Sequence, residues 1–204
     1  MLRKILLVTS GLFHPPYFGR MAVHLALKSM DGFAFQHISA LGKLPANLGD
    51  FSAMVLYFHH KTIPDAALKQ LEGFVSSGGG ILAIHSATAS FKAAKGYFDI
   101  LGGRFSGHGP VQDFEIVGQQ TGIFDGVMPF RIKDELYLHE LQPGIEVHYT
   151  ASLQGQHIPV VWTYRYGRGK ICYAAPGHTV ESMKHPAMQE ILRQGLKWTC
   201  RDDD

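Results

Sequence analysis

Four side chains that could transfer protons or bind a metal ion are spread along this chain, at His85, His108, Glu135 and His178. Imidazole titrates near neutral pH, so histidine can act as a general acid or base, and glutamate can act as a base. One hypothesis is that the four residues converge in space and form one catalytic site. Because imidazoles and carboxylates also bind divalent metals, a metal ion held by the same four residues is an alternative. The chain contains no HExxH or CxxC spacing, so the sequence leaves this choice open.

His85 follows a pattern typical of a strand that delivers a residue to a binding site. In the segment GGGILAIHSAT, at 78–88, a glycine turn leads into the apolar run Ile81–Ile84, which ends abruptly in polar residues. The length and apolar character of this run predict a buried parallel strand. Ligands of open α/β sheets bind beyond the carboxyl ends of such strands. We therefore expect the sheet to hold His85 while leaving it accessible, and His178 repeats the arrangement after the strand-like run Lys170–Ala174.

The other two candidates lie in segments with the composition of turns. His108 belongs to the glycine-rich segment GGRFSGHGP, at 102–110, where glycines permit close approach of the backbone to a ligand. This segment matches neither the phosphate-binding GxxxxGK[ST] order nor the dinucleotide-binding GxGxxG pattern. Glu135 follows Asp134 directly after an apolar strand, and we predict a turn there. Taken singly, each segment is better explained by an ordinary exposed turn.

Strand-like and helix-like runs alternate through the first half of the chain. Strands are predicted at Lys4–Thr9, Phe33–Ser39, Ser52–Phe58 and Ile81–Ile84, and helices up to Met30, at Pro64–Ser76 and at Ser90–Leu101. This alternation predicts a doubly wound, mainly parallel sheet. After Gly103 come short strand-like runs and a closing helix, at Val111–Val117, Pro129–Ile132, Ile145–Ser152, Pro159–Tyr164, Lys170–Ala174 and Pro186–Trp198. No linker or repeat separates the two halves, so we predict a single domain over residues 1–204.

The composition favours a globular cytoplasmic protein and argues against several binding classes. The formal net charge is only +2, and hydrophobic residues make up 46% of the 204 positions. Without a basic run or an aromatic-basic stripe, nucleic acid is not an expected partner, and no apolar stretch is long enough to predict a membrane span. The amino-terminal apolar run lacks a cleavage site, which indicates a strand rather than a signal peptide. Cys172 lies inside a predicted strand and is expected to be buried and unreactive.

Several segments together resemble the ThuA-like family, the trehalose-utilisation proteins. They are GGGILAIHSAT at 78–88, LGGRFSGHG at 101–109, FRIKDELY at 130–137, PVVWTYRYGRGKICYAAPGHT at 159–179 and HPAMQEILRQGLKW at 185–198. The resemblance implies an α/β fold with a three-layer α/β/α, flavodoxin-like arrangement similar to the class I glutamine amidotransferases, a mainly parallel sheet and added C-terminal strands. In those enzymes a cysteine nucleophile occupies the turn that His85 occupies here, so glutamine hydrolysis is not expected. Many relatives carry His-Pro after the GGRF turn, where this chain has His108-Gly109-Pro110.

The family resemblance also implies a role in sugar metabolism. We predict an enzyme of the hydrolase or lyase type that acts on a disaccharide or keto-glycoside, a small-molecule carbohydrate, with histidines as acids and bases. In a 3-keto-glycoside the ketone acidifies the C2 proton, and removal of this proton allows the glycosidic oxygen to leave. The predicted substrate-binding residues are His14, Ser86, Tyr137 and Trp162, although Trp162 fits a core position equally well. A non-catalytic sugar-binding or regulatory module and an unrelated metal-dependent hydrolase are the alternatives, and homo-oligomerisation is left open.

Overall fold

One continuous β-sheet forms the centre of the protein. The computed structural model describes residues 2–11, 15, 17–118, 122–153 and 155–201. Within these ranges the sheet has nine strands in the spatial order β2-β1-β3-β4-β9-β8-β7-β5-β6. The strands are β1 Arg3–Thr9, β2 Phe33–Ile38, β3 Ala53–Tyr57, β4 Gly80–Ile84, β5 Gly103–Gly118, β6 Phe130–Leu141, β7 Glu146–Leu153, β8 Gln156–Tyr166 and β9 Gly169–Ala174. The α-helices are α1 Tyr17–Lys28, α2 Asp65–Ser76, α3 Lys95–Leu101, α4 Val180–Lys184 and α5 Pro186–Thr199, with 3-10 helices η1 Leu41–Lys43, η2 His85–Ala87 and η3 Gly122–Phe124.

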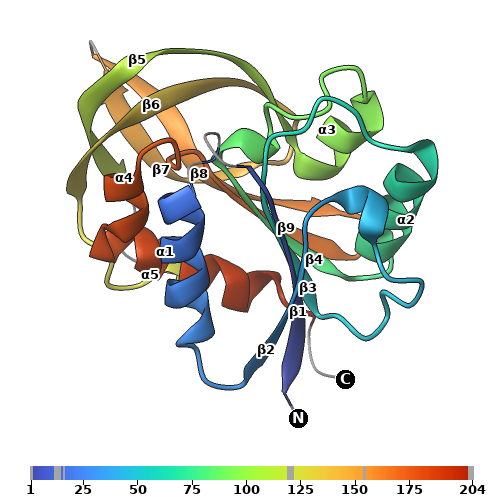
Figure 1. The fold of residues 1–204 in the computed structure, drawn as a ribbon. Helices are drawn as coiled ribbons and strands as arrows, with labels where there is room; N and C mark the ends of the chain where they lie inside the picture. The colour runs from blue at the N-terminus through green and yellow to red at the C-terminus, as the bar shows by residue number, and fades with distance from the viewer. Residues whose placement is uncertain (1, 12–14, 16, 119–121, 154, 202–204) are drawn as a thin grey trace.

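Five strands at one end of the sheet run parallel, as the alternation of strands and helices predicts. They are β2, β1, β3, β4 and β9, and every residue of β3 and β4 is buried. Figure 1 shows α2 and α3 on one side of these strands and α1 and α5 on the other, which explains why apolar residues dominate both faces. This arrangement confirms the predicted α/β class. Of the helices that are described, none has the length and apolar character needed to cross a bilayer.

The other end of the sheet is antiparallel. Strands β9, β8, β7, β5 and β6 pair in that order, each antiparallel to the next. The connections explain the change, because antiparallel neighbours can be joined by a tight turn whereas parallel neighbours need a long crossover. The turn between β8 and β9 is of this kind, with Gly167 at a φ of +58°. The expected C-terminal strands are therefore present, but they make the sheet as a whole mixed rather than mainly parallel.

Two segments that were predicted as turns are parts of long paired strands. His108 lies in β5 opposite Tyr137 of β6, and Glu135 lies in β6, not in a turn. The glycine-rich composition around His108 produces register shifts on both sides of this residue instead of a loop. The prediction was wrong because the partner strand β6 supplies backbone hydrogen bonds that the local composition does not reveal. Both residues are consequently carried by a two-stranded ribbon.

The helices also differ from the prediction at two places. The helix expected over Ser90–Leu101 begins only at Lys95, because Phe91 adopts a φ of +52°, which an α-helix does not accommodate. A short helix, α4, follows β9 and was not predicted. Its N-cap is Thr179, whose hydroxyl accepts a hydrogen bond from a backbone N–H in the first turn. This cap lies directly after His178 and helps to define the end of the segment that carries it.

Candidate active site

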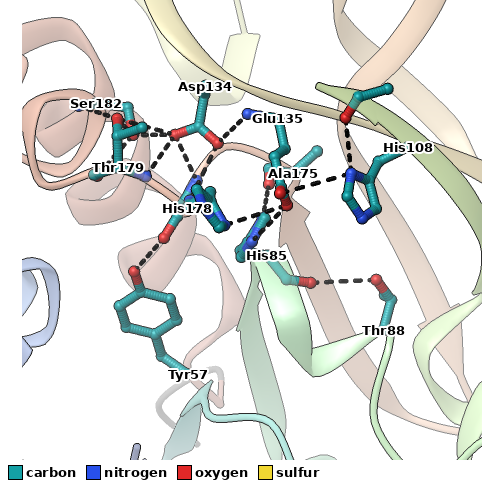
Figure 2. A network of polar contacts seen from close by, with 12 residues as sticks. Tyr57, His85, Thr88, His108, Asp134, Glu135, Ala175, His178, Thr179 and Ser182 are labelled. Carbon is teal, nitrogen blue, oxygen red and sulfur yellow. Dashed lines mark hydrogen bonds and ion pairs between the residues drawn. The ribbon is translucent and has the colours of Figure 1, made fainter. Parts of the chain in front are cut away.

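Glu135 lies where three histidines from distant parts of the chain meet (Figure 2). Its Oε2 atom lies 3.1 Å from Nδ1 of His178 and 3.9 Å from Nε2 of His85. Its Oε1 atom lies 3.5 Å from Nδ1 of His108. His85 follows β4 and His178 follows β9, whereas the other two residues come from the β5–β6 ribbon. The structure thus brings the four residues into one group, here called the Glu135 cluster, and their catalytic roles remain a prediction.

His85 is held in a constrained position at the carboxyl end of β4. Its φ of +46° lies in the left-handed region, which is uncommon for a residue other than glycine. Its Nδ1 atom lies 2.8 Å from the carbonyl oxygen of Ala175, which can only accept, so Nδ1 carries the proton and Nε2 faces Glu135. The side chain is completely buried, so the expectation that His85 remains accessible is wrong. The loop after β9 covers it, and a Cβ added at Gly177 would lie only 2.5 Å from the His85 Cβ.

Solvent reaches the cluster from the side of His108 and His178. The side chain of His108 is 40% exposed and that of His178 is 32% exposed, whereas the side chain of Glu135 is only 12% exposed. Nδ1 of His108 also lies 2.7 Å from the carbonyl oxygen of Gly109, so this nitrogen donates and Nε2 carries the lone pair of the neutral ring. A ligand that enters the cluster would therefore meet the two exposed imidazoles before the carboxylate.

Asp134 fixes the segment that carries His178. Its buried carboxylate accepts hydrogen bonds from the backbone N–H groups of residues 177–179, at 3.2, 3.0 and 3.1 Å. It also accepts from the N–H of Glu135 at 2.7 Å and from the hydroxyl of Ser182. Burial raises the pKa of the Asp134 carboxyl, and the hydrogen bonds from Ser182 and from the backbone oppose this rise. Sequence reasoning missed this role, because the partners lie 43 to 45 residues further along the chain.

Tyr137 packs against two histidines of the cluster. It lies two residues after Glu135 on β6, and side chains two residues apart share one face of a strand. Its ring centroid lies 4.0 Å from that of His85 and 5.5 Å from that of His108. Only 2% of the residue is exposed, and burial raises the pKa of its hydroxyl, which stays protonated. The structure therefore supports Tyr137 as a residue that positions the imidazoles rather than as an open platform for a sugar.

His139 and Trp162 belong to the packed interior behind the cluster. Trp162 is completely buried, with its ring centroid 4.2 Å from that of Tyr173 and 4.9 Å from that of His139. No face of this ring is exposed to stack on a sugar, so of the two interpretations the core position is correct. His139 was not among the predicted site residues. Its Nε2 lies 3.0 Å from the hydroxyl of Thr88, and burial lowers its pKa to about 3.

The remaining predicted residues divide into buried and undescribed ones. Ser86 is completely buried in η2, directly after His85. His14 lies outside the residues that the structure describes. Cys172 is completely buried in β9, and burial raises the pKa of its thiol to about 12, as expected for an unreactive cysteine. A thiolate mechanism at Cys172 is therefore not supported.

The Glu135 cluster can serve two kinds of chemistry. Imidazoles beside a carboxylate can exchange protons with a bound substrate as general acids and bases. His85, Glu135 and His178 also offer one donor atom each, and these atoms all lie within 4.8 Å of one another, close enough to hold a metal ion. The geometry is compatible with both predicted uses.

The chain belongs to the ThuA family, described as trehalose utilisation, because it matches this family over residues 4–199. No curated protein matched the sequence. A solved ThuA-like protein from Parabacteroides merdae ATCC 43184 has a TM-score of 0.85 and 18% identity, covering 98% of this chain and 90% of that chain. A ThuA-like protein from Bacteroides uniformis ATCC 8492 has a TM-score of 0.80 and 17% identity, covering 97% of this chain and 91% of that chain. A protein from Salmonella typhimurium LT2, described as cytoplasmic, has a TM-score of 0.71 and 14% identity, covering 98% of this chain and 100% of that chain. At these identities the structural likeness establishes the fold alone.

Proposed function

We propose that this member of the ThuA family is an enzyme of sugar metabolism that cleaves a keto-glycoside by acid–base chemistry at the Glu135 cluster. The observation that carries the proposal is the position of Glu135, whose carboxylate oxygens lie 3.1, 3.5 and 3.9 Å from ring nitrogens of three histidines. Titratable groups that converge in a partly buried place are typical of active sites. The description of the family as trehalose utilisation supports a disaccharide or another glycoside as the substrate class.

The proposed reaction is an elimination from a glycoside that carries a ketone at C3. The ketone acidifies the hydrogen on C2, so a base of moderate strength can remove it as a proton and leave an enolate. As the C3 carbonyl forms again, a double bond forms between C1 and C2 and the bond from C1 to the glycosidic oxygen breaks. The departing oxygen takes up a proton. The products are an enone and an alcohol or second sugar, and no oxidant or reductant is consumed.

His108 is the proposed base, because it is the most exposed imidazole of the cluster and its Nε2 carries the lone pair. Protonated His108 can then give a proton to the glycosidic oxygen, or return one that has exchanged with solvent to C2, so one residue serves both steps. The enolate oxygen needs positive charge or a hydrogen-bond donor nearby. His178 is placed for this role, since its side chain is 32% exposed and its Nδ1 lies 3.1 Å from the carboxylate of Glu135, within the same cluster as the proposed base.

Turnover and isotope exchange test the proposal. Purified protein is incubated in heavy water with trehalose, simple glucosides and their 3-keto derivatives, and NMR follows deuterium at C2 and release of the alcohol. We expect exchange and release with keto substrates, and a loss of about 10²–10⁴-fold in rate in His108→Ala. His157→Ala, which removes an exposed histidine on β8, is the matched control and should retain the full rate. Saturable sugar binding without exchange or release would refute catalysis and favour the non-catalytic sugar-binding module.

A further inference from the structure

We infer that His85, Glu135 and His178 form a binding site for one divalent first-row transition metal ion. The inference rests on the proposed function for the chemical role of the ion, but the binding itself is argued from the three side chains alone. Two imidazoles and one carboxylate are a ligand set that suits zinc, cobalt, manganese and iron. Calcium and magnesium are less suited, since they prefer sites made of oxygen atoms.

The spacing of the donor atoms fits such an ion. Ligands that lie about 2.0–2.1 Å from a tetrahedral metal are about 3.3 Å from one another. In the structure the Oε2 atom of Glu135 lies 3.1 Å from Nδ1 of His178 and 3.9 Å from Nε2 of His85. One donor atom of each residue lies within 4.8 Å of the other two. The carboxylate oxygen is therefore already close to the required spacing from both imidazoles, and the donors would draw further together on binding one ion.

A hydrogen bond behind His85 orients its ring as a metal ligand requires, and Asp134 anchors the segment that carries His178. Metal-binding histidines usually donate their second ring N–H to a carbonyl or carboxylate, which directs the other nitrogen at the metal. His85 does so, because its Nδ1–H donates to the carbonyl of Ala175 and its Nε2 faces Glu135 (Figure 2). The backbone of His178 is fixed in turn by its N–H bond to Asp134, at 3.0 Å. These contacts give the site rigid support before an ion arrives.

The burial of the three residues leaves one side of the site open. His85 is completely buried and Glu135 is 12% exposed, whereas His178 is 32% exposed. Three protein ligands with an open position are the arrangement of catalytic rather than structural metal sites. The open side is the side of His108, which lies 3.5 Å from the outer carboxylate oxygen of Glu135. A substrate oxygen bound there would lie next to the proposed base, so the ion would supply the positive charge that stabilises an enolate.

Titration of chelator-stripped protein with Co²⁺ and Zn²⁺ tests the site without any substrate. Calorimetry gives the stoichiometry and affinity, and the visible absorption of Co²⁺ reports nitrogen and oxygen ligands. We expect one equivalent to bind. Loss of an outer partner of a metal ligand typically lowers affinity about 10–100-fold, so loss of a ligand in His178→Ala or Glu135→Gln should lower it by about 100-fold or more. His157→Ala, the exposed control histidine, should bind as the wild type does.

Circular dichroism first confirms that each variant is folded, and the two ligand variants serve as checks on one another. Less than one equivalent bound to the wild type, or equal affinity in wild type, His178→Ala and Glu135→Gln, would overturn the inference. The two proposals fail separately. One equivalent of Co²⁺ without turnover of any keto-glycoside would refute the proposed function and leave the metal site standing. Full turnover by stripped protein that binds no metal would refute the metal site and leave the function standing.

Discussion

Replacing the Asp134 carboxylate by an amide, in Asp134→Asn, should destabilise the protein and displace His178. One carboxylate oxygen accepts the N–H groups of residues 177 and 179, at 3.2 and 3.1 Å, and the other accepts those of residues 135 and 178, at 2.7 and 3.0 Å. An asparagine keeps only one accepting oxygen. Whichever way the amide turns, its NH₂ group faces two backbone N–H donors, which are left without an acceptor.

The size of the effect follows from those two donors. Each buried N–H left unsatisfied costs about 1–3 kcal/mol, so Asp134→Asn should lower the free energy of unfolding by about 2–6 kcal/mol. Domains of this kind are stable by only about 5–15 kcal/mol, so the loss is large on that scale. Urea denaturation followed by circular dichroism measures it. We also expect weaker binding of Co²⁺, because the backbone of His178 loses its anchor.

Asp99→Asn is the matched control for this experiment. Among the described residues, Asp99 accepts one side-chain hydrogen bond, from Gln142 at 3.3 Å near the surface, so the same chemical change should alter stability by no more than about 0.5 kcal/mol. If Asp134→Asn were as mild as Asp99→Asn, the carboxylate would not be the anchor of the segment 177–179. The argument that Asp134 positions His178 would then be wrong.

Three further substitutions follow from the same geometry. In His108→Ala the rate of keto-glycoside cleavage should fall about 10²–10⁴-fold. The free energy of unfolding, measured by urea denaturation, should change by about 0.5 kcal/mol or less. An unchanged rate would show that His108 is not the base. In Gly177→Ala the new Cβ would lie 2.5 Å from the His85 Cβ. We therefore expect a loss of about 1–3 kcal/mol in stability and weaker binding of Co²⁺. Wild-type stability and wild-type affinity for Co²⁺ would contradict the close approach. Burial lowers the pKa of His139 from 6.5 to about 3. Between these pH values the unfolded chain binds more protons at this residue than the folded chain does. The free energy of unfolding should therefore fall by about 1.4 kcal/mol for each pH unit below 6.5. His139→Gln retains a donor for Thr88 and should therefore lose about 2 kcal/mol less than the wild type when denaturation is compared at pH 7 and pH 5, whereas equal losses would show that His139 does not titrate in this way.

The parallel half of the fold could be predicted from the chain because its signals are local. The apolar run Ile81–Ile84 lies between a glycine turn and polar residues, and the structure places β4 at Gly80–Ile84. The helix predicted over Pro64–Ser76 was likewise found at Asp65–Ser76, with Pro64 as its N-cap. Apolar periodicity and chain-breaking residues decide such elements within a few residues of sequence. His85 could be placed at a strand end for the same reason.

The predictions that failed depended on partners far away in the sequence. Residues 102–110 have the composition of a loop, yet β6 pairs with them and makes them part of a strand. The burial of His85 depends on the loop after β9, which no pattern around residue 85 reveals. Trp162 was compatible with a site or with the core, and only packing against Tyr173 and His139 decided for the core. In each case a contact between distant segments outweighed the local signal.

The sequence by itself determined which residue types could do chemistry and which strands precede His85 and His178, because both depend only on short stretches of chain. The tertiary structure alone decided that the β5–β6 ribbon brings Glu135 between His85 and His178, and that Asp134 binds the loop that carries His178. It also decided which imidazoles are exposed and which are sealed. The physical reason is that burial, the spacing of donor atoms and hydrogen-bond partners depend on pairs of segments. They are fixed only when the chain folds and brings segments that are distant in sequence into contact.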